Sequence, residues 1–239
     1  MTDLLHSVRF PNESEAFRSA RNELLDAEIE LRRAVELVAA KRRALPMGGE
    51  IPEDYVFEEL SEDGNEVQEV RLSDLFSPGK DTLVIYSFMY GPKMKAACPL
   101  CTSILDGLDG QVPHIEQRVS FYVVAKSPVK RITRFARQRG WRNLRLLSSA
   151  ENTYNHDYQG EDAHGDQMPG VNVFVRRDGR IYHTYGTELM LVKPDPGQDP
   201  RPVDMIWPLW NVLDYTPDGR GNWHPSLSYD EGLTPSPPA

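Results

Sequence analysis

The stretch Thr82-Leu83-Val84-Ile85-Tyr86-Ser87-Phe88, with Cys98-Pro99-Leu100-Cys101 a short loop further on, decides how this chain folds. Its first part is a continuous apolar, β-rich run, which is typical of a strand buried on both faces of a sheet. Its second part begins a pattern with Ile104, Leu105 and Leu108 at helical spacing. That spacing predicts a helix that packs against the sheet. The sequence therefore predicts a strand, a loop, and a helix that starts at the cysteine pair.

Apolar runs further along the chain complete an α/β pattern. Residues 119–125 predict a second buried strand, and residues 129–139, closed by Gly140, predict an amphipathic helix. Strands that are joined by a crossover helix pair in parallel. Turn signals between paired apolar runs predict two antiparallel hairpins, at residues 55–60 with 66–72 and at residues 171–175 with 181–185. This order of elements predicts a thioredoxin-like fold, a central mixed sheet flanked by helices.

A long helix is predicted ahead of this sheet. Asn12 and Glu15 form a capping box at its start, and the helical pattern runs to about Leu45. Its apolar side chains recur every seven residues and form a narrow seam, at Phe17, Leu24, Leu31 and Val38. The seam either packs on a second copy of the chain, giving a homodimer, or wraps the chain's own domain.

The chain divides by composition into three parts. A chain of 239 residues can bury one substantial core, and we expect a helical arm over residues 1–50 and a thioredoxin-like domain over 51–215. A last helix over residues 203–213 is expected to bury its tryptophans in the core. Residues 216–239 form an irregular tail rich in Pro and Gly, and its last residues, 234–239, are expected to be disordered.

The charge balance excludes one class of partner. The formal net charge of −9 argues against a duplex nucleic-acid binder, which must neutralise phosphates with Lys and Arg. The segment 118–145 differs from the acidic chain as a whole, because it holds many basic residues and no acidic one. It forms either a solvated helix face or a docking site for an acidic partner. No run resembles a membrane span or a secretory signal, so residence in the cytoplasm is the expectation.

Cys98 and Cys101 are the two cysteines of the chain, and their spacing indicates redox or metal chemistry. A helix N-terminus lowers the pKa of a thiol there, because partial positive charge and free N–H groups stabilise the thiolate. Pro99 suits the first helical position, where its missing N–H costs nothing. We therefore expect Cys98 to attack a disulfide and Cys101 to resolve the mixed disulfide. Lys93 and Lys95 are candidates for adding positive potential.

A zinc site is the alternative use of such a cysteine pair. It needs two further ligands, for which the chain offers scattered histidines such as His114, His156 and His164. None of these forms a second pair with ligand spacing. The expectation is therefore a dithiol that needs neither a metal nor another cofactor.

At these residues the chain resembles the bacterial family catalogued as domain of unknown function 899, thioredoxin-like proteins regarded as dithiol-disulfide oxidoreductases. The resemblance covers most of the chain. It rests on motifs around the cysteines, in the middle of the chain and near its end: Met89-Tyr-Gly-Pro92, Ala97-Cys-Pro-Leu-Cys101, Gly140-Trp141, Ser148-Ser149, Tyr154-Asn-His-Asp157 and Asp214-Tyr-Thr-Pro-Asp-Gly-Arg220. It implies the fold and a redox activity.

The resemblance also implies further site residues. Thioredoxin-like proteins carry a cis-proline that faces the dithiol and helps to bind the partner, and the likeness places Pro169 there, with Met168 beside it and Pro99 next to the attacking thiol. The alternative for Pro169 is an ordinary trans proline at the start of an edge strand. The family motifs also hold Tyr154, Asn155, Asp157 and Arg220, which either line a substrate pocket or make structural hydrogen bonds.

Three functions remain open from the sequence. The first is an oxidoreductase acting on a protein or small-molecule disulfide. The second is a thioredoxin-like peroxidase. Peroxiredoxins, however, place a threonine three residues before the peroxide-reacting cysteine, where this chain has Lys95. The third is a non-enzymatic interaction module that uses the long helix and the basic segment.

Overall fold

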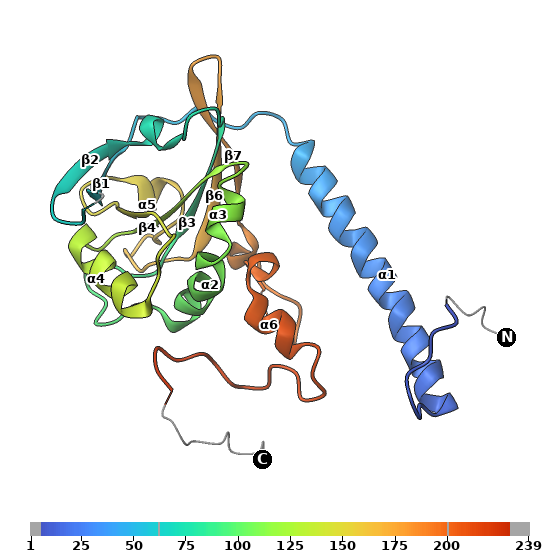
Figure 1. Cartoon of the computed structure of the whole chain (residues 1–239). Helices are drawn as coiled ribbons and strands as arrows, with labels where there is room; N and C mark the ends of the chain where they lie inside the picture. Colours follow the sequence, from blue (N-terminus) through green and yellow to red (C-terminus); the bar gives the residue numbers. More distant parts are fainter. Residues whose placement is uncertain (1–5, 62, 200, 230–239) are drawn as a thin grey trace. The chain divides into compact units, whose positions relative to one another are not determined.

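The computed structural model of the chain describes residues 6–61, 63–199 and 201–229, which form two compact units, Met1–Pro46 and Met47–Ala239. The first unit holds helix α1 (Glu15–Arg43). Figure 1 shows the elements of the second unit, which are β1 (Val56–Leu60), β2 (Val67–Arg71), η1 (Leu72–Leu75), β3 (Thr82–Ser87), α2 (Pro99–Asp109), α3 (Val112–Ile115), β4 (Ser120–Ala125), α4 (Val129–Arg139), β5 (Leu146–Ser148), α5 (Tyr154–Asp157), β6 (Gly170–Arg177), β7 (Arg180–Gly186), η2 (Leu189–Leu191), η3 (Asp204–Ile206) and α6 (Pro208–Leu213).

The strands of the second unit form one sheet in the order β2-β1-β5-β4-β3-β6-β7. The pairs β3 with β4 and β4 with β5 are parallel, as crossover connections through α2 and α4 require. Both predicted hairpins are present and antiparallel, β1 with β2 and β6 with β7. β6 also pairs antiparallel with β3, from Thr82 opposite Val175 to Ser87 opposite Gly170. The predicted mixed sheet is confirmed, and this strand order with its connections is that of the thioredoxin-like fold.

Alternate side chains of β3 divide the core between the two faces of the sheet, because successive residues of a strand point to opposite sides. Leu83 and Ile85 pack on one face with η1 and α5. Tyr86 packs on the other face with α2, α4, Trp207 and Trp210. The cysteines belong to this second face, together with Tyr86, α2 and the loop before it, and the tryptophans that follow β7.

The N-terminal unit has a different cap from the one predicted. α1 begins at Glu15, and the Ser14 hydroxyl accepts a hydrogen bond from the N–H of Phe17 at 3.1 Å. Asn12 takes a left-handed φ of 60° and lies in the turn before the helix, so it cannot be the cap. Ser14 has the extended backbone that a cap requires. In the described part of the chain no helix is long and apolar enough to cross a membrane.

The prediction of one continuous helix over residues 203–213 is wrong. The chain forms η3 and then α6, with Trp207 at the junction. Pro208 explains the break, because it lacks the N–H that a continuous helix would need and suits the first turn of a new one. Trp207 and Trp210 are buried as predicted. Residues 234–239 lie outside the described residues.

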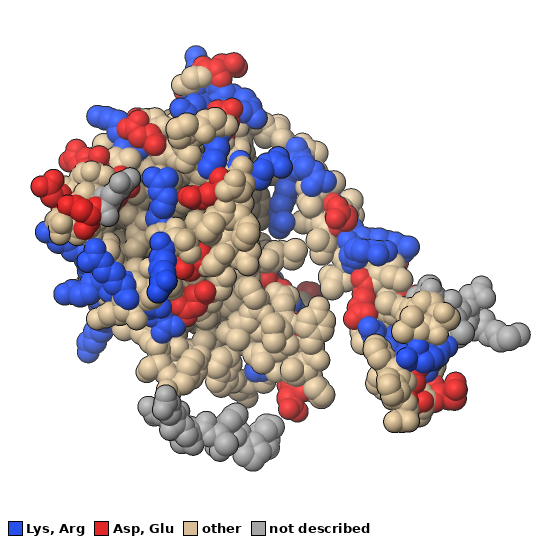
Figure 2. Space-filling view, viewed as in Figure 1, with Lys and Arg blue, Asp and Glu red and all other residues tan. Residues whose placement is uncertain are grey.

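The basic segment 118–145 is partly used within the domain. Arg139 of α4 pairs with Asp106 of α2, and Lys126 pairs with Glu161. Figure 2 shows lysine and arginine side chains gathered on the side of the domain where α4 lies, while the surface over α2 and α6 holds few of them.

Candidate active site

Cys98 lies at the junction between the loop after β3 and helix α2. It is the N-cap residue of the helix, and Pro99 occupies the first turn, as predicted. The Cys98 N–H donates to the carbonyl of Met89 at 3.0 Å. Its own carbonyl accepts from both the N–H and the hydroxyl of Thr102, at 3.0 and 2.8 Å. Both sides of the cysteine are thus fixed by hydrogen bonds.

The loop between β3 and Cys98 is held from α4. Arg131 donates hydrogen bonds to the carbonyls of Gly91 and Met94, and its guanidinium lies 4.2 Å from the ring centre of Tyr90. Gly91 suits this position because a Cβ there would lie 2.7 Å from the side chain of Gln167. The basic segment therefore contributes to the site by fixing the loop rather than by entering it.

The two thiols differ sharply in environment. Both are unpaired, and Cys98 is 9% exposed whereas Cys101 is 2% exposed. A hydrogen bond from the Cys101 thiol, helped by the N–H groups of Cys101 and Leu100, lowers the pKa of Cys98 to about 6 against the cost of burial. The same interaction and complete burial raise the pKa of Cys101 well above its usual value. The pair is therefore asymmetric, with the pKa of the Cys98 thiol below its ordinary value and that of the Cys101 thiol above it.

Tyr86 adds a third polar group, which the sequence reasoning missed. Its ring is fully buried on the dithiol face of β3, and burial together with the charge of Cys101 raises the pKa of the phenol. The phenol contacts Cys101 and lowers the pKa of that thiol. Among the described residues its hydroxyl has no hydrogen-bond partner of regular geometry. The available signal was a tyrosine directly after three aliphatic residues of the strand, Leu83, Val84 and Ile85.

A cavity of about 320 Å³ opens onto both cysteines. One side is formed by Met89, Leu100 and Ile104 near the dithiol, and by Met168 and Pro169 at the start of β6. The other side is formed by the chain beyond β7, residues 187–199 and 201–229, which we call the C-terminal segment. Its lining side chains are Met190, Asp199, Pro202, Val203, Trp207, Trp210 and His224.

The structure places part of the predicted site around the dithiol and corrects one detail. Met168 and Pro169 line the cavity, and Pro99 adjoins Cys98 without lining it. The expected cis bond before Pro169 is wrong, since the described residues contain no cis peptide bond. A trans bond is the common state before proline and here leads directly into β6, where Gly170 pairs with Ser87.

Three of the predicted pocket residues lie elsewhere. Tyr154 is buried in the cluster on the opposite face of the sheet. Asn155 accepts a hydrogen bond from Ser149 and donates to Gln167, and Asp157 accepts from Tyr55 at 2.8 Å. The structure therefore assigns Asn155 and Asp157 to structural hydrogen bonds and Tyr154 to the core, and none of the three lines the cavity.

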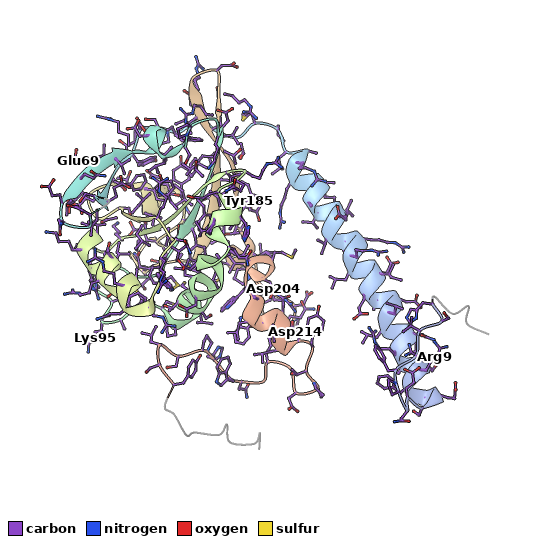
Figure 3. All side chains as sticks on the ribbon, viewed as in Figure 1. Arg9, Glu69, Lys95, Tyr185, Asp204 and Asp214 are labelled. Atoms are coloured by element: carbon purple, nitrogen blue, oxygen red, sulfur yellow. The ribbon has the colours of Figure 1, made fainter. Side chains whose placement is uncertain are left out.

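The predicted cations also lie away from the thiols. Arg220 donates to Asp214 and Asp204 at 2.8 to 3.0 Å and lies over the ring of Trp210, outside the cavity lining. Lys93 and Lys95 are exposed, and Figure 3 labels Lys95 at the edge of the domain. Within the described ranges no three His, Cys, Asp or Glu side chains are grouped to hold a metal ion.

The mixed sheet and the Cys-x-x-Cys pair that starts the helix after β3 define a thioredoxin-like protein with a dithiol. The chain belongs to the family described as "Bacterial protein of unknown function (DUF899)", whose model matches residues 7–231. This confirms the resemblance seen in the sequence. No curated protein matches the chain.

Solved structures with a similar arrangement include several peroxiredoxins. Reduced 2-Cys peroxiredoxin of Plasmodium vivax is 17% identical, with 70% of this chain and 96% of that chain covered and a TM-score of 0.45. Thioredoxin peroxidase I of Plasmodium yoelii is 18% identical, with 76% and 100% covered and a TM-score of 0.44. Peroxidoxin BcpB of Mycobacterium tuberculosis is 18% identical, with 71% and 98% covered and a TM-score of 0.41.

Proposed function

We propose that this protein is a dithiol-disulfide oxidoreductase in which Cys98 is the nucleophile and Cys101 the resolving cysteine. The observation that carries the proposal is the asymmetry of the pair. The pKa of Cys98 is lowered to about 6 and its thiol opens onto a cavity, whereas Cys101 is buried with a raised pKa. A nucleophile that is ionised at neutral pH beside a protonated, protected partner is the arrangement that thiol-disulfide exchange uses.

The reaction proceeds in two exchanges. The Cys98 thiolate attacks one sulfur of the substrate disulfide, the substrate S–S bond breaks, and the first thiolate product leaves and takes a proton. Cys101 then loses its proton and attacks the sulfur of Cys98, which releases the second thiol and forms the Cys98–Cys101 disulfide. Two electrons and two protons pass from the dithiol to the substrate, and the reverse sequence oxidises a substrate dithiol.

Trapping experiments test the two roles. A Cys101→Ser variant should accumulate a mixed disulfide through Cys98, and intact-mass spectrometry should show the added substrate half. A Cys98→Ser variant should trap none, because Cys101 is buried and protonated. Equal trapping by both variants would overturn the role assignment. A wild-type pair that never forms a disulfide in a redox buffer would overturn the function.

The direction of electron flow follows from the reduction potential of the pair. A value near about −270 mV suits a reductant, and one near about −120 mV suits an oxidant. Equilibration with glutathione buffers, read by quenched mass spectrometry, measures it. Consumption of hydrogen peroxide with a sulfenic acid at Cys98, in place of disulfide exchange, would instead favour the peroxidase alternative.

A further inference from the structure

We propose that the substrate of this dithiol is a small apolar molecule that carries a disulfide, received in the cavity between the cysteines and the C-terminal segment. The inference rests on the proposed function, and it narrows the expected substrate from any disulfide to a small apolar one. Two observations carry it: the chemical character of the cavity walls, and the way the C-terminal segment covers the dithiol.

The walls of the cavity are apolar. Thioether, aliphatic, proline and indole groups form most of the lining, with Met89 and Ile104 on the dithiol side and Trp207 and Trp210 opposite. Asp199 and His224 are the ionisable lining side chains besides the cysteines, and no lysine or arginine is among the described residues that line it. A carboxylate entering the cavity would lose its water without gaining a cationic partner. The lining therefore disfavours charged disulfides such as oxidised glutathione.

The C-terminal segment is fastened over the dithiol helix. The Trp207 indole donates to the hydroxyl of Ser103 on α2 at 3.0 Å, and the ring of Pro208 packs against Gly107 of the same helix. Further along, Arg139 of α4 donates to the carbonyl of Leu227 at 2.7 Å. These contacts hold the segment close to α2 and leave Cys98 9% exposed. A disulfide on the surface of a folded protein would have to displace this segment, whereas a small molecule enters the cavity.

The size of the cavity agrees with this substrate class. At about 320 Å³ it lies at the lower end of ligand pockets, and apolar walls with few polar groups are typical of sites for small molecules. Burial of apolar substrate groups against the tryptophans supplies the binding free energy. The thiolate of Cys98 in the cavity wall then meets the substrate sulfur.

A substrate comparison tests the class. Oxidation of the reduced wild-type protein would be followed with dibutyl disulfide, oxidised glutathione and insulin, each rate being divided by the rate of the same disulfide with free dithiothreitol. The normalised second-order rate constant for dibutyl disulfide should exceed that for oxidised glutathione about tenfold or more, with insulin the poorest. A preference for glutathione or insulin overturns this inference and leaves the proposed function standing. If none of the three oxidises the pair, the proposed function itself fails.

A binding experiment tests the cavity separately from the chemistry. Calorimetry with dibutyl disulfide and the Cys98→Ser variant measures binding without reaction. In that background Val203→Phe should fill the cavity, and Met190→Glu should place a carboxylate at its wall, each weakening binding about tenfold. The matched controls are Val212→Phe and Leu189→Glu, which alter exposed neighbours that do not line the cavity.

Each outcome of this calorimetric experiment either supports or overturns the cavity as the substrate site. Weakening by the lining variants and not by their controls supports the cavity as the substrate site. Parent-like binding by both lining variants, or no binding to the Cys98→Ser protein at all, overturns it. If thermal unfolding shows that Val203→Phe does not fold, Met190→Glu, at a part-exposed position, carries the test.

Discussion

The phenol of Tyr86 lies against the thiol of Cys101, both of them buried beneath Cys98. Among the described residues the phenol hydroxyl has no hydrogen-bond partner of regular geometry. A buried polar group without a partner costs about 1–3 kcal/mol, so its presence needs a reason. The reaction supplies one, because Cys101 must become a thiolate in a site where burial opposes ionisation.

Tyr86→Phe should therefore slow the second exchange and spare the first. The phenol lowers the pKa of Cys101, so its removal raises that pKa further and makes the resolving thiolate scarcer. We expect the mixed disulfide to persist severalfold longer in single-turnover experiments, because a smaller share of Cys101 is then the attacking thiolate. Alkylation of Cys98 should keep its rate, and the thermal stability should not fall. Quenched-flow mass spectrometry follows the mixed disulfide.

The matched control for this change is Tyr154→Phe. Tyr154 is also fully buried, and its hydroxyl has no hydrogen-bond partner of regular geometry among the described residues, but it lies on the opposite face of the sheet. Removal of the Tyr154 hydroxyl should leave the rates of both exchanges unchanged. Equal effects of the two substitutions would show that packing, and not the phenol beside Cys101, sets the rate.

The reactivity of Cys98 should follow a low pKa. Because the thiolate is the reactive form and the pKa of Cys98 is about 6, the rate of alkylation by iodoacetamide should rise with pH through that value and level off above neutrality. Cys101→Ala removes the thiol that donates to Cys98, so the midpoint should move up toward the ordinary cysteine value of about 8.5. Peptide mass spectrometry of the alkylated protein gives both curves.

Cys101→Ser separates the hydrogen bond from the packing in this experiment. A serine hydroxyl still donates, so its curve should lie between those of the parent and Cys101→Ala. Identical midpoints in all three proteins would show that the helix start alone lowers the pKa of Cys98.

The sheet and the start of α2 could be predicted from the sequence because their signals are local. An apolar strand run, a proline in the first helical turn and periodic leucines each act within a few residues. The burial of Trp207 and Trp210 was predicted correctly, but the surface against which they pack was not. That depends on the return of the chain beyond β7 onto α2, which no periodic pattern announces.

The remaining errors also have physical causes. Tyr154, Asn155 and Asp157 form a polar motif that looks like a binding site in one dimension. The fold instead buries Tyr154 in the core on the far face of the sheet, while Asn155 and Asp157 form hydrogen bonds with Ser149 and Tyr55. Tyr86 was read as one more apolar strand residue, since only the crossing of α2 over β3 brings its hydroxyl to Cys101.

Arg220 should control access to the dithiol through the C-terminal segment. It joins Asp204 and Asp214, which Figure 3 labels near α6, and covers the ring of Trp210. Arg220→Ala should loosen the segment, lower the free energy of unfolding by about 1 kcal/mol, and speed labelling of Cys98 by a bulky maleimide severalfold. Labelling by small iodoacetamide should change less, because that reagent already enters the cavity.

Arg177→Ala is the control for this loss of charge, since Arg177 is exposed and 3.9 Å from its partner Asp81. It should change neither labelling rate. Unaltered maleimide labelling of Arg220→Ala, measured by time-resolved mass spectrometry, would contradict a covering role for the segment.

The seam of α1 should pair two copies of the chain. Within the N-terminal unit its large members Phe17, Leu24, Leu31 and Val38 stay exposed, and their spacing of seven residues is that of a coiled coil. A double variant Leu24→Glu and Leu31→Glu places like charges on both sides of such a contact and should convert a dimer into a monomer, measured by light scattering. Ile29→Glu introduces a single carboxylate on the opposite side of the helix, judged by helical periodicity, and should leave the dimer intact. A wild-type protein that is monomeric at every concentration tested would mean that the seam does not pair two chains.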